Sequence, residues 1–129
     1  MKIGTYFNDY ELACSCHLHA TDAQGRNILD STIDKRLVDV LDAIRERIGQ
    51  PIYINSGYRC PKHNAEVGGV PNSQHVEGTA ADITYDGIDV DYLAQVAKEC
   101  GADGVGRYYC QDFVHVDVRG YDASWSDID

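Results

Sequence analysis

Residues 113–118 alternate between two kinds of side chain. Valine recurs at every second position, at 114, 116 and 118, and the positions between hold Phe113, His115 and Asp117. Because successive side chains of a β-strand point to opposite faces of a sheet, one face of this segment is apolar and the other carries a histidine and an aspartate. The pattern predicts a strand that packs its valines into the core and presents His115 and Asp117 to a site.

Residues 79–85 have the same property. Ala81 and Ile83 share one face of the predicted strand, whereas Asp82 lies on the other. His75 precedes Asp82 by seven residues in a loop, and Gly78 allows the chain to bend between them. This second segment therefore offers a histidine and an aspartate of its own.

Two histidines and an aspartate form a plausible zinc site. Catalytic zinc takes three protein ligands and keeps a fourth position for water, and His75, Asp82 and His115 would supply the three. The alternative is that both histidines are ordinary ones, hydrogen-bonded in the core or at the surface. Spacing alone leaves the two interpretations open.

A family resemblance favours the zinc site over two ordinary histidines. The motif Ser73-x-His75-x-x-Gly78-x-Ala80-x-Asp82, followed far downstream by an acid-x-x-His, resembles the zinc D-Ala-D-Ala carboxypeptidases. Related enzymes are the D,D-dipeptidases of vancomycin resistance and certain phage L-alanyl-D-glutamate endolysins. The runs SGYRCPKHN (56–64) and GGVPNSQH (68–75) match the compact bacterial and phage branch of that group. The resemblance covers most of the chain, from about Ile33 to Tyr121.

The resemblance implies a ligand set and a catalytic acid. His75, Asp82 and His115 would bind one catalytic Zn²⁺, and Asp112, three residues before His115, stands where the family has its catalytic Glu or Asp. Strict strand alternation puts Asp112 on the opposite face from His115, so it must lie in the turn before the strand. Asp117, on the same face as His115, is the competing base, or a partner that orients a histidine. We favour Asp112.

The resemblance also implies a substrate side. Arg59 matches the arginine that holds a substrate carboxylate or polarises the scissile carbonyl, and Ser73 and Gln74 would line the substrate. The hedgehog-like relatives of the family keep a zinc site without a peptidase role. Here both the acid and the arginine are present, which favours an enzyme.

Helical and strand-like segments alternate along the chain. Apolar residues at helical spacing predict a helix over 33–48, capped by Asp30 or Ser31 and ended by Gly49 and Pro51. A second helix should follow a cap at Asp89 and stop at Gly101. A short helix is expected over 61–66, and strands over 52–54, 79–85, 105–109 and 113–118, the last two as a hairpin.

These elements predict one α+β domain over residues 1–129. Helices should pack on a mostly antiparallel sheet, and the resemblance implies the hedgehog-like fold of the zinc DD-peptidases. The order of the strands does not follow. The tail from Tyr121 is acidic, and Trp125 is its expected anchor.

Charge and cysteine content limit the partners. The net charge of −10 over 129 residues argues against nucleic acid and against adhesion to an anionic membrane, and no stretch approaches the roughly 20 apolar residues of a spanning helix. A monomer is expected.

The five cysteines, Cys14, Cys16, Cys60, Cys100 and Cys110, leave open both the disulfide pairing and the redox compartment of the protein. The Cys14-Ser15-Cys16-His17-Leu18-His19 cluster could bind a second metal, form disulfides or remain as thiols.

The predicted activity is zinc-dependent hydrolysis of peptidoglycan stem peptides, by a carboxypeptidase or an endopeptidase. The N-terminus lacks the apolar run of a signal peptide. We therefore expect a phage or prophage product, or a domain from a longer protein, that acts on the bacterial cell wall. The alternative function is a non-catalytic peptidoglycan- or peptide-binding module that retains a structural zinc.

Overall fold

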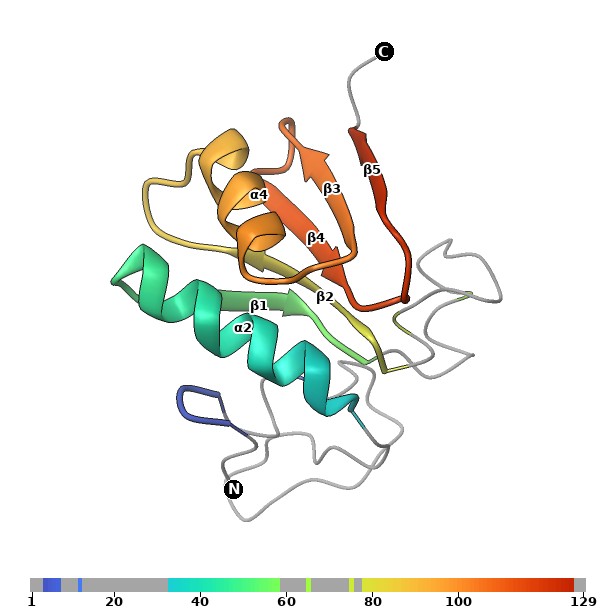
Figure 1. Cartoon of the computed structure of the whole chain (residues 1–129). Coiled ribbons are helices and arrows are strands. Elements are labelled where there is room, and N and C mark those ends of the chain that lie inside the picture. Colours follow the sequence, from blue (N-terminus) through green and yellow to red (C-terminus); the bar gives the residue numbers. More distant parts are fainter. Residues whose placement is uncertain are drawn as a thin grey trace.

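The computed structural model describes residues 4–7, 33–58 and 78–126, together with Leu12, Ala65 and His75. The described helices and strands come in the order α2 (Lys35–Ile48), β1 (Tyr53–Ser56), β2 (Ala80–Thr84), α4 (Val90–Glu99), β3 (Gly104–Tyr108), β4 (Phe113–Asp117) and β5 (Ala123–Ser126). The predicted α+β fold is confirmed (Figure 1).

The five strands form one sheet in the order β1-β2-β4-β3-β5. Neighbouring strands are antiparallel except β3 and β5, which are parallel. The expected hairpin is present between β3 and β4, with its turn over residues 109–112. β2 and β4 therefore meet in the middle of the sheet, although about 30 residues separate them in sequence.

The register aligns the polar positions of different strands in rows across the sheet. One row contains five directly paired residues, Ser56, Asp82, His115, Gly106 and Trp125. A second row, two positions away along each strand, contains Ala80, Asp117, Gly104 and Ala123. Because side chains alternate between faces, both rows lie on the same face of the sheet.

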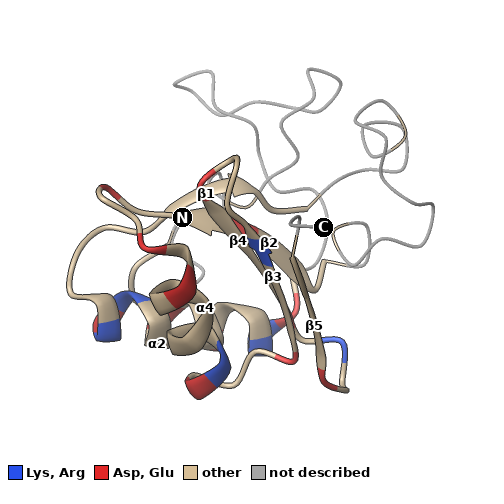
Figure 2. Ribbon diagram, turned by 90° about the horizontal axis from the view of Figure 1, so that it is seen from above, with Lys and Arg blue, Asp and Glu red and all other residues tan. Residues whose placement is uncertain are grey.

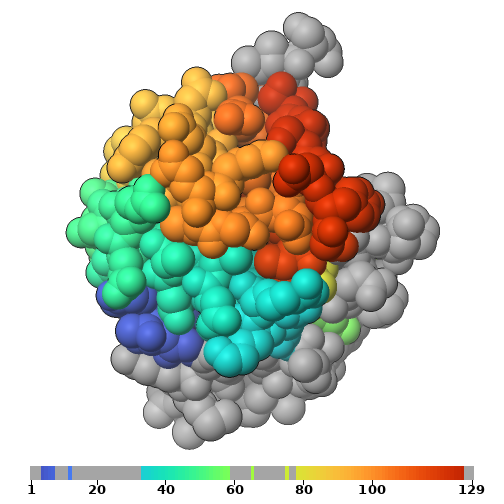
Figure 3. Space-filling model, viewed as in Figure 1, coloured from blue at the N-terminus to red at the C-terminus, as the bar shows by residue number. Residues whose placement is uncertain are grey.

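The opposite face is covered by the two helices. Figures 1 and 2 show α2 and α4 on one side of the sheet, and Figure 3 shows their side chains closing over that side. Leu41 and Ile44 of α2, Leu93 of α4, and Val114 and Val116 of the sheet are fully buried in one hydrophobic core cluster. The predicted valine face is thus the core face, and burial of such side chains contributes about 1.5–3 kcal/mol each.

The ends of the helices differ in part from the prediction. α2 is capped by Asp34 rather than by Asp30 or Ser31, because the Asp34 carboxylate accepts a hydrogen bond from the backbone N–H of Arg36. Gly49 ends α2 in the left-handed conformation with φ 79°, as expected. Asp89 caps α4 and accepts from the backbone N–H of Tyr92, also as expected.

The C-terminal segment was predicted as a tail and is instead an edge strand. β5 has only four residues, ASWS, and its side chains alternate between half-buried and exposed, so it lacks a continuous apolar signal. Its strand character comes from parallel pairing with β3, a contact that a local pattern cannot reveal. Trp125 does anchor the segment.

Two predictions concern segments that the structure describes in part or not at all. Ala65 is helical, but the rest of the expected 61–66 helix and the Cys14–His19 cluster lie outside the described residues. Cys100 is a half-buried free thiol whose pKa burial raises. No described helix has the length and hydropathy needed to cross a bilayer.

Candidate metal centre

Three predicted ligands converge on one point of the sheet. Asp82 and His115 face each other on β2 and β4, and Asp82 Oδ1 lies 3.1 Å from His115 Nδ1. His75 comes from the preceding turn, and its Nε2 lies 3.3 Å from Asp82 Oδ1. One ligand atom from each residue lies within 4.8 Å of the other two, and all three side chains are buried.

The turn that delivers His75 is fixed by backbone contacts. The N–H of Gly78 donates to the carbonyl of His75, and Gly78 has φ 76°, a left-handed conformation that favours glycine. His75 Nδ1 lies 2.8 Å from the carbonyl oxygen of Gly57. A carbonyl only accepts, so Nδ1 carries the proton and Nε2 is the acceptor nitrogen directed at Asp82.

His115 is oriented by a second contact of the same kind. Its Nε2 lies 2.8 Å from Asp117 Oδ2. If the Asp117 carboxylate accepts the Nε2 proton, Nδ1 becomes the acceptor nitrogen that faces Asp82. This contact fits the second role predicted for Asp117, that of a partner that orients a histidine.

The convergence of three acceptors requires a positive charge. Two imidazole nitrogens and a carboxylate oxygen repel one another unless protons or a metal cation lie between them. The three atoms belong to the ligand types that zinc prefers, in the number a catalytic site uses. We conclude that His75, Asp82 and His115 fit a zinc ion.

Protons can balance the Asp82 carboxylate where no cation lies between the three side chains. Burial alone would raise the pKa of the Asp82 carboxyl, but hydrogen bonds from His115 and His75 outweigh it and lower the pKa to about 2. Burial alone would lower the pKa of His115, yet Asp117 and Asp82 outweigh it and raise that pKa. The Asp82 carboxylate is therefore ionised, and a metal cation at this point would replace the protons that face it.

Asp117 itself is held by an arginine. Its carboxylate is fully buried, and the Arg119 guanidinium donates to Oδ1 from Nε at 2.9 Å and to Oδ2 from a terminal nitrogen at 2.7 Å. Burial would raise the pKa of Asp117, but hydrogen bonds with His115 and Arg119 lower it well below its usual range. Both carboxylate oxygens are engaged, so Asp117 is a poor candidate for a base that must meet water.

Glycines in β3 make room for this arrangement. A Cβ at Gly104 would overlap the carboxylate of Asp117, and a Cβ at Gly106 would overlap the indole of Trp125. Trp125 lies beside the centre, with its ring centroid 5.0 Å from that of His115. Its Nε1–H donates to the hydroxyl of Tyr108 at 2.8 Å.

Sequence reasoning did not assign these supporting residues. A usable signal was present in Gly-Val-Gly at 104–106, because two glycines on one face of a strand mark a close approach. The Gly57 carbonyl and the Arg119 contact have no comparable local signal.

The predicted acid Asp112 lies in the turn before β4, as the alternation required. It is exposed, with φ 56°, and its backbone carbonyl accepts a hydrogen bond from Thr84 Oγ1 at 2.8 Å. Thr84 shares its face of β2 with Asp82, so this bond ties the turn to the face that carries the predicted metal ligands. A catalytic role for Asp112 stays a prediction.

The predicted substrate contacts cannot be placed in the same way. Arg59, Ser73 and Gln74 lie outside the described residues, and their roles stay predictions. Two of them flank placed residues in the chain. Arg59 follows Gly57 by two positions, and Gln74 directly precedes His75.

Comparisons with known proteins point to a single family. The Peptidase M15 family model matches residues 5–117. The peptidoglycan L,D-endopeptidase MepK of Escherichia coli (strain K12) is 33% identical over 94 residues, which cover 67% of this chain and 52% of that protein. The zinc D-Ala-D-Ala carboxypeptidase of Streptomyces albus G is 37% identical over 89 residues, covering 67% of this chain and 35% of that protein. The chain thus spans about half the length of the first relative and about a third of the second.

Proposed function

Because this chain belongs to the Peptidase M15 family, we propose that it is a zinc-dependent peptidase that hydrolyses peptidoglycan stem peptides. The observation that carries the proposal is the convergence of His75, Asp82 and His115 within 4.8 Å. The names of two relatives, a peptidoglycan L,D-endopeptidase and a zinc D-Ala-D-Ala carboxypeptidase, support the substrate class.

Zinc, when bound, supplies a water with a pKa near 7 and a Lewis acid for the scissile carbonyl. The chain supplies the proton transfers. In our proposal the Asp112 carboxylate accepts a proton from the attacking water and delivers it to the leaving amine. Its exposed position and its tie to Thr84 support this role. Such a base contributes roughly 10²–10⁴-fold to the rate.

In the same proposal Arg59 binds the substrate. A guanidinium beside the centre would pair with a terminal carboxylate or stabilise the oxyanion that forms at the carbonyl. Arg59 follows Gly57, whose carbonyl holds His75, by two positions in the sequence, and this proximity supports the proposal. Ser73 and Gln74, directly before His75, would contact the peptide.

Analysis of the reaction products would identify the bond that is cleaved. Purified muropeptides would be incubated with zinc-loaded protein and examined by mass spectrometry, with a chelator-treated sample as control. Loss of one alanine would identify a carboxypeptidase, and release of a larger stem fragment would identify an endopeptidase. Unchanged muropeptides in the presence of bound zinc would contradict the proposal and favour a non-catalytic binding module.

We propose further that the chain acts as a monomer and binds neither nucleic acid nor membrane. The net charge of −10 supports the expected lack of nucleic-acid and membrane binding, since polyanions are bound through lysine and arginine. Light scattering after gel filtration should give the mass of one chain, 14.3 kDa. A mass of two chains would contradict the monomer.

A further inference from the structure

Arg119 lies outside the ligand set, yet it is connected to the metal centre through one buried carboxylate. Asp117 Oδ2 accepts from both His115 Nε2 and a terminal nitrogen of Arg119, at 2.8 and 2.7 Å. Asp117 Oδ1 accepts from Nε of Arg119 at 2.9 Å and from its backbone N–H at 3.2 Å. Each oxygen of Asp117 therefore has two donors, and three of the four come from Arg119.

The geometry of these bonds suits arginine rather than lysine. Asp117 is fully buried, and a buried carboxylate is stable only when donors satisfy it. The planar guanidinium offers two parallel N–H groups, which meet both oxygens and prevent the carboxylate from rotating. A lysine ammonium would supply charge at a single point and leave that rotation possible.

The guanidinium is itself held from the other side. Its central carbon lies 5.2 Å from the ring centroid of Trp125 and 5.6 Å from that of Tyr121. The chain turns back towards β5 at Gly120, where φ is 98° and the N–H donates to Asp103 Oδ2 at 2.8 Å. Arg119 is thus enclosed between Asp117 and the aromatic residues of the C-terminal segment.

The carboxylate that Arg119 fixes decides which nitrogen of His115 is available. With Asp117 in place the Nε2 proton has a partner, and Nδ1 faces Asp82 as an acceptor. If Asp117 rotates away, the His115 ring loses the contact that selects this tautomer and this orientation. Metal affinity then falls although all three ligands are still present.

We propose that Arg119 is a positioning residue of the metal centre, which acts on zinc affinity and coordination through Asp117 and His115. This inference rests on the proposed zinc function. Arg119 is not itself a ligand, and it is linked to the ligand His115 through Asp117. This link also makes the segment after β4 a part of the centre.

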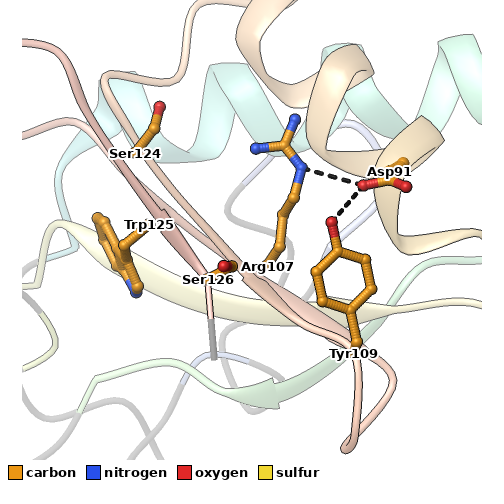
Figure 4. Close-up of a pocket in the computed structure, with 6 residues that line it drawn as sticks. All are labelled: Asp91, Arg107, Tyr109, Ser124, Trp125 and Ser126. Carbon is orange, nitrogen blue, oxygen red and sulfur yellow. Dashed lines mark hydrogen bonds and ion pairs between the residues drawn. The ribbon is translucent and has the colours of Figure 1, made fainter. Parts of the chain in front are cut away.

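Arg107 provides a matched control. It lies on β3 and forms an ion pair with Asp91 of α4, with Nε 3.3 Å from Oδ1. Figure 4 shows Arg107 and Tyr109 both directed at Asp91, while the Trp125 side chain points away from them. These residues line an open cavity of about 450 Å³. Arg107 is paired with Val114, a core-face residue, so it lies on the sheet face opposite the metal ligands.

The test compares Arg119→Gln, Arg119→Lys and Arg107→Gln with the unchanged protein. Zinc affinity would be measured by competition with a chromophoric chelator, and coordination by the visible spectrum of the Co²⁺-loaded protein. Circular dichroism of the metal-free proteins would report folding. We expect Arg119→Gln to weaken zinc binding by about tenfold or more and to change the Co²⁺ spectrum. Arg119→Lys should show a smaller loss, and Arg107→Gln none.

Folded Arg119→Gln with unchanged zinc affinity and an unchanged Co²⁺ spectrum would overturn the proposal. If Arg119→Gln does not fold, Arg119→Lys tests the proposal instead. Zinc affinity and a Co²⁺ spectrum equal to those of the unchanged protein would then show that the two parallel N–H groups of the guanidinium are not needed. An equal loss in Arg107→Gln would also overturn it, since the effect would then be general. Failure of the unchanged protein to bind zinc would instead overturn the proposed function.

Discussion

Asp82 and His115 are directly paired in the β2–β4 ladder, with Asp82 Oδ1 3.1 Å from His115 Nδ1. Two of the three predicted metal ligands thus lie on hydrogen-bonded strands in the middle of the sheet, and this pairing fixes the positions of their backbones. The third ligand, His75, reaches the same point from a turn and is held by the Gly57 carbonyl. Positions fixed by the fold in this way reduce the cost of ordering the ligands when a metal binds.

The first prediction concerns the Asp82 carboxylate. Asp82→Asn keeps the size of the side chain but removes the negative charge that both histidines face, so zinc affinity should fall by at least about 100-fold. Chelator competition measures the loss, and Asp86→Asn, in the exposed turn after β2, is the control. Tight zinc binding by Asp82→Asn would remove Asp82 from the ligand set.

The second prediction separates catalysis from metal binding at Asp112. Asp112→Ala should lower turnover of muropeptides by roughly 10²–10⁴-fold, because it removes the proposed base, and should leave the zinc content unchanged. Asp122→Ala, another exposed aspartate, should retain full activity. Full activity of Asp112→Ala would transfer the role of base to another group.

The third prediction tests the space that β3 leaves for Asp117. A methyl group at position 104 would overlap the Asp117 carboxylate, so Gly104→Ala should destabilise the protein by about 1–3 kcal/mol and weaken zinc binding. Gly87 has φ 77° and nothing within 4 Å of an added Cβ. Gly87→Ala should therefore lower stability through backbone strain alone and leave zinc affinity intact. Equal zinc affinities in the two variants would refute the role of Gly104.

Some of this centre could be predicted because the signals are local. The alternation in residues 113–118 and 79–85 shows which side chains share a face, and that alternation places Asp82 and His115 opposite the core in the structure. The direct pairing of the two residues depends on the strand order. A sequence pattern does not contain that order, because β2 and β4 are joined through α4 and β3.

The supporting contacts are non-local, and sequence reasoning missed them for that reason. His75 and Gly57 are 18 residues apart, and the pairing of β1 with β2 brings the two segments together. β5 has no amphipathic pattern, and parallel pairing with β3 alone brings Trp125 over Gly106. The predicted cap of α2 lies too early in the sequence because several polar residues precede the helix. Asp34 is distinguished by its contact with the Arg36 N–H, which a sequence pattern does not show.

The last prediction concerns that cap. Asp34→Ala removes the acceptor for the Arg36 N–H and should lower the free energy of unfolding by about 1 kcal/mol near neutral pH. Hydrogen bonds from Arg36 hold the pKa of Asp34 below its ordinary value of 3.8 in the folded protein. The cap is therefore fully effective above that value and is lost as the pH falls through the lower, folded-state pKa.

Urea unfolding near neutral pH and well below pH 3.8 measures how the free energy of unfolding depends on pH. The protein is treated with a chelator because bound metal would add a stabilisation of its own. The difference between Asp34→Ala and the unchanged protein should shrink in acid. Asp39→Ala breaks only the exposed pair with Lys35 on the same helix and should change stability by no more than about 0.5 kcal/mol. A loss for Asp34→Ala that is equal at both pH values would mean that the carboxylate charge does not contribute to the cap.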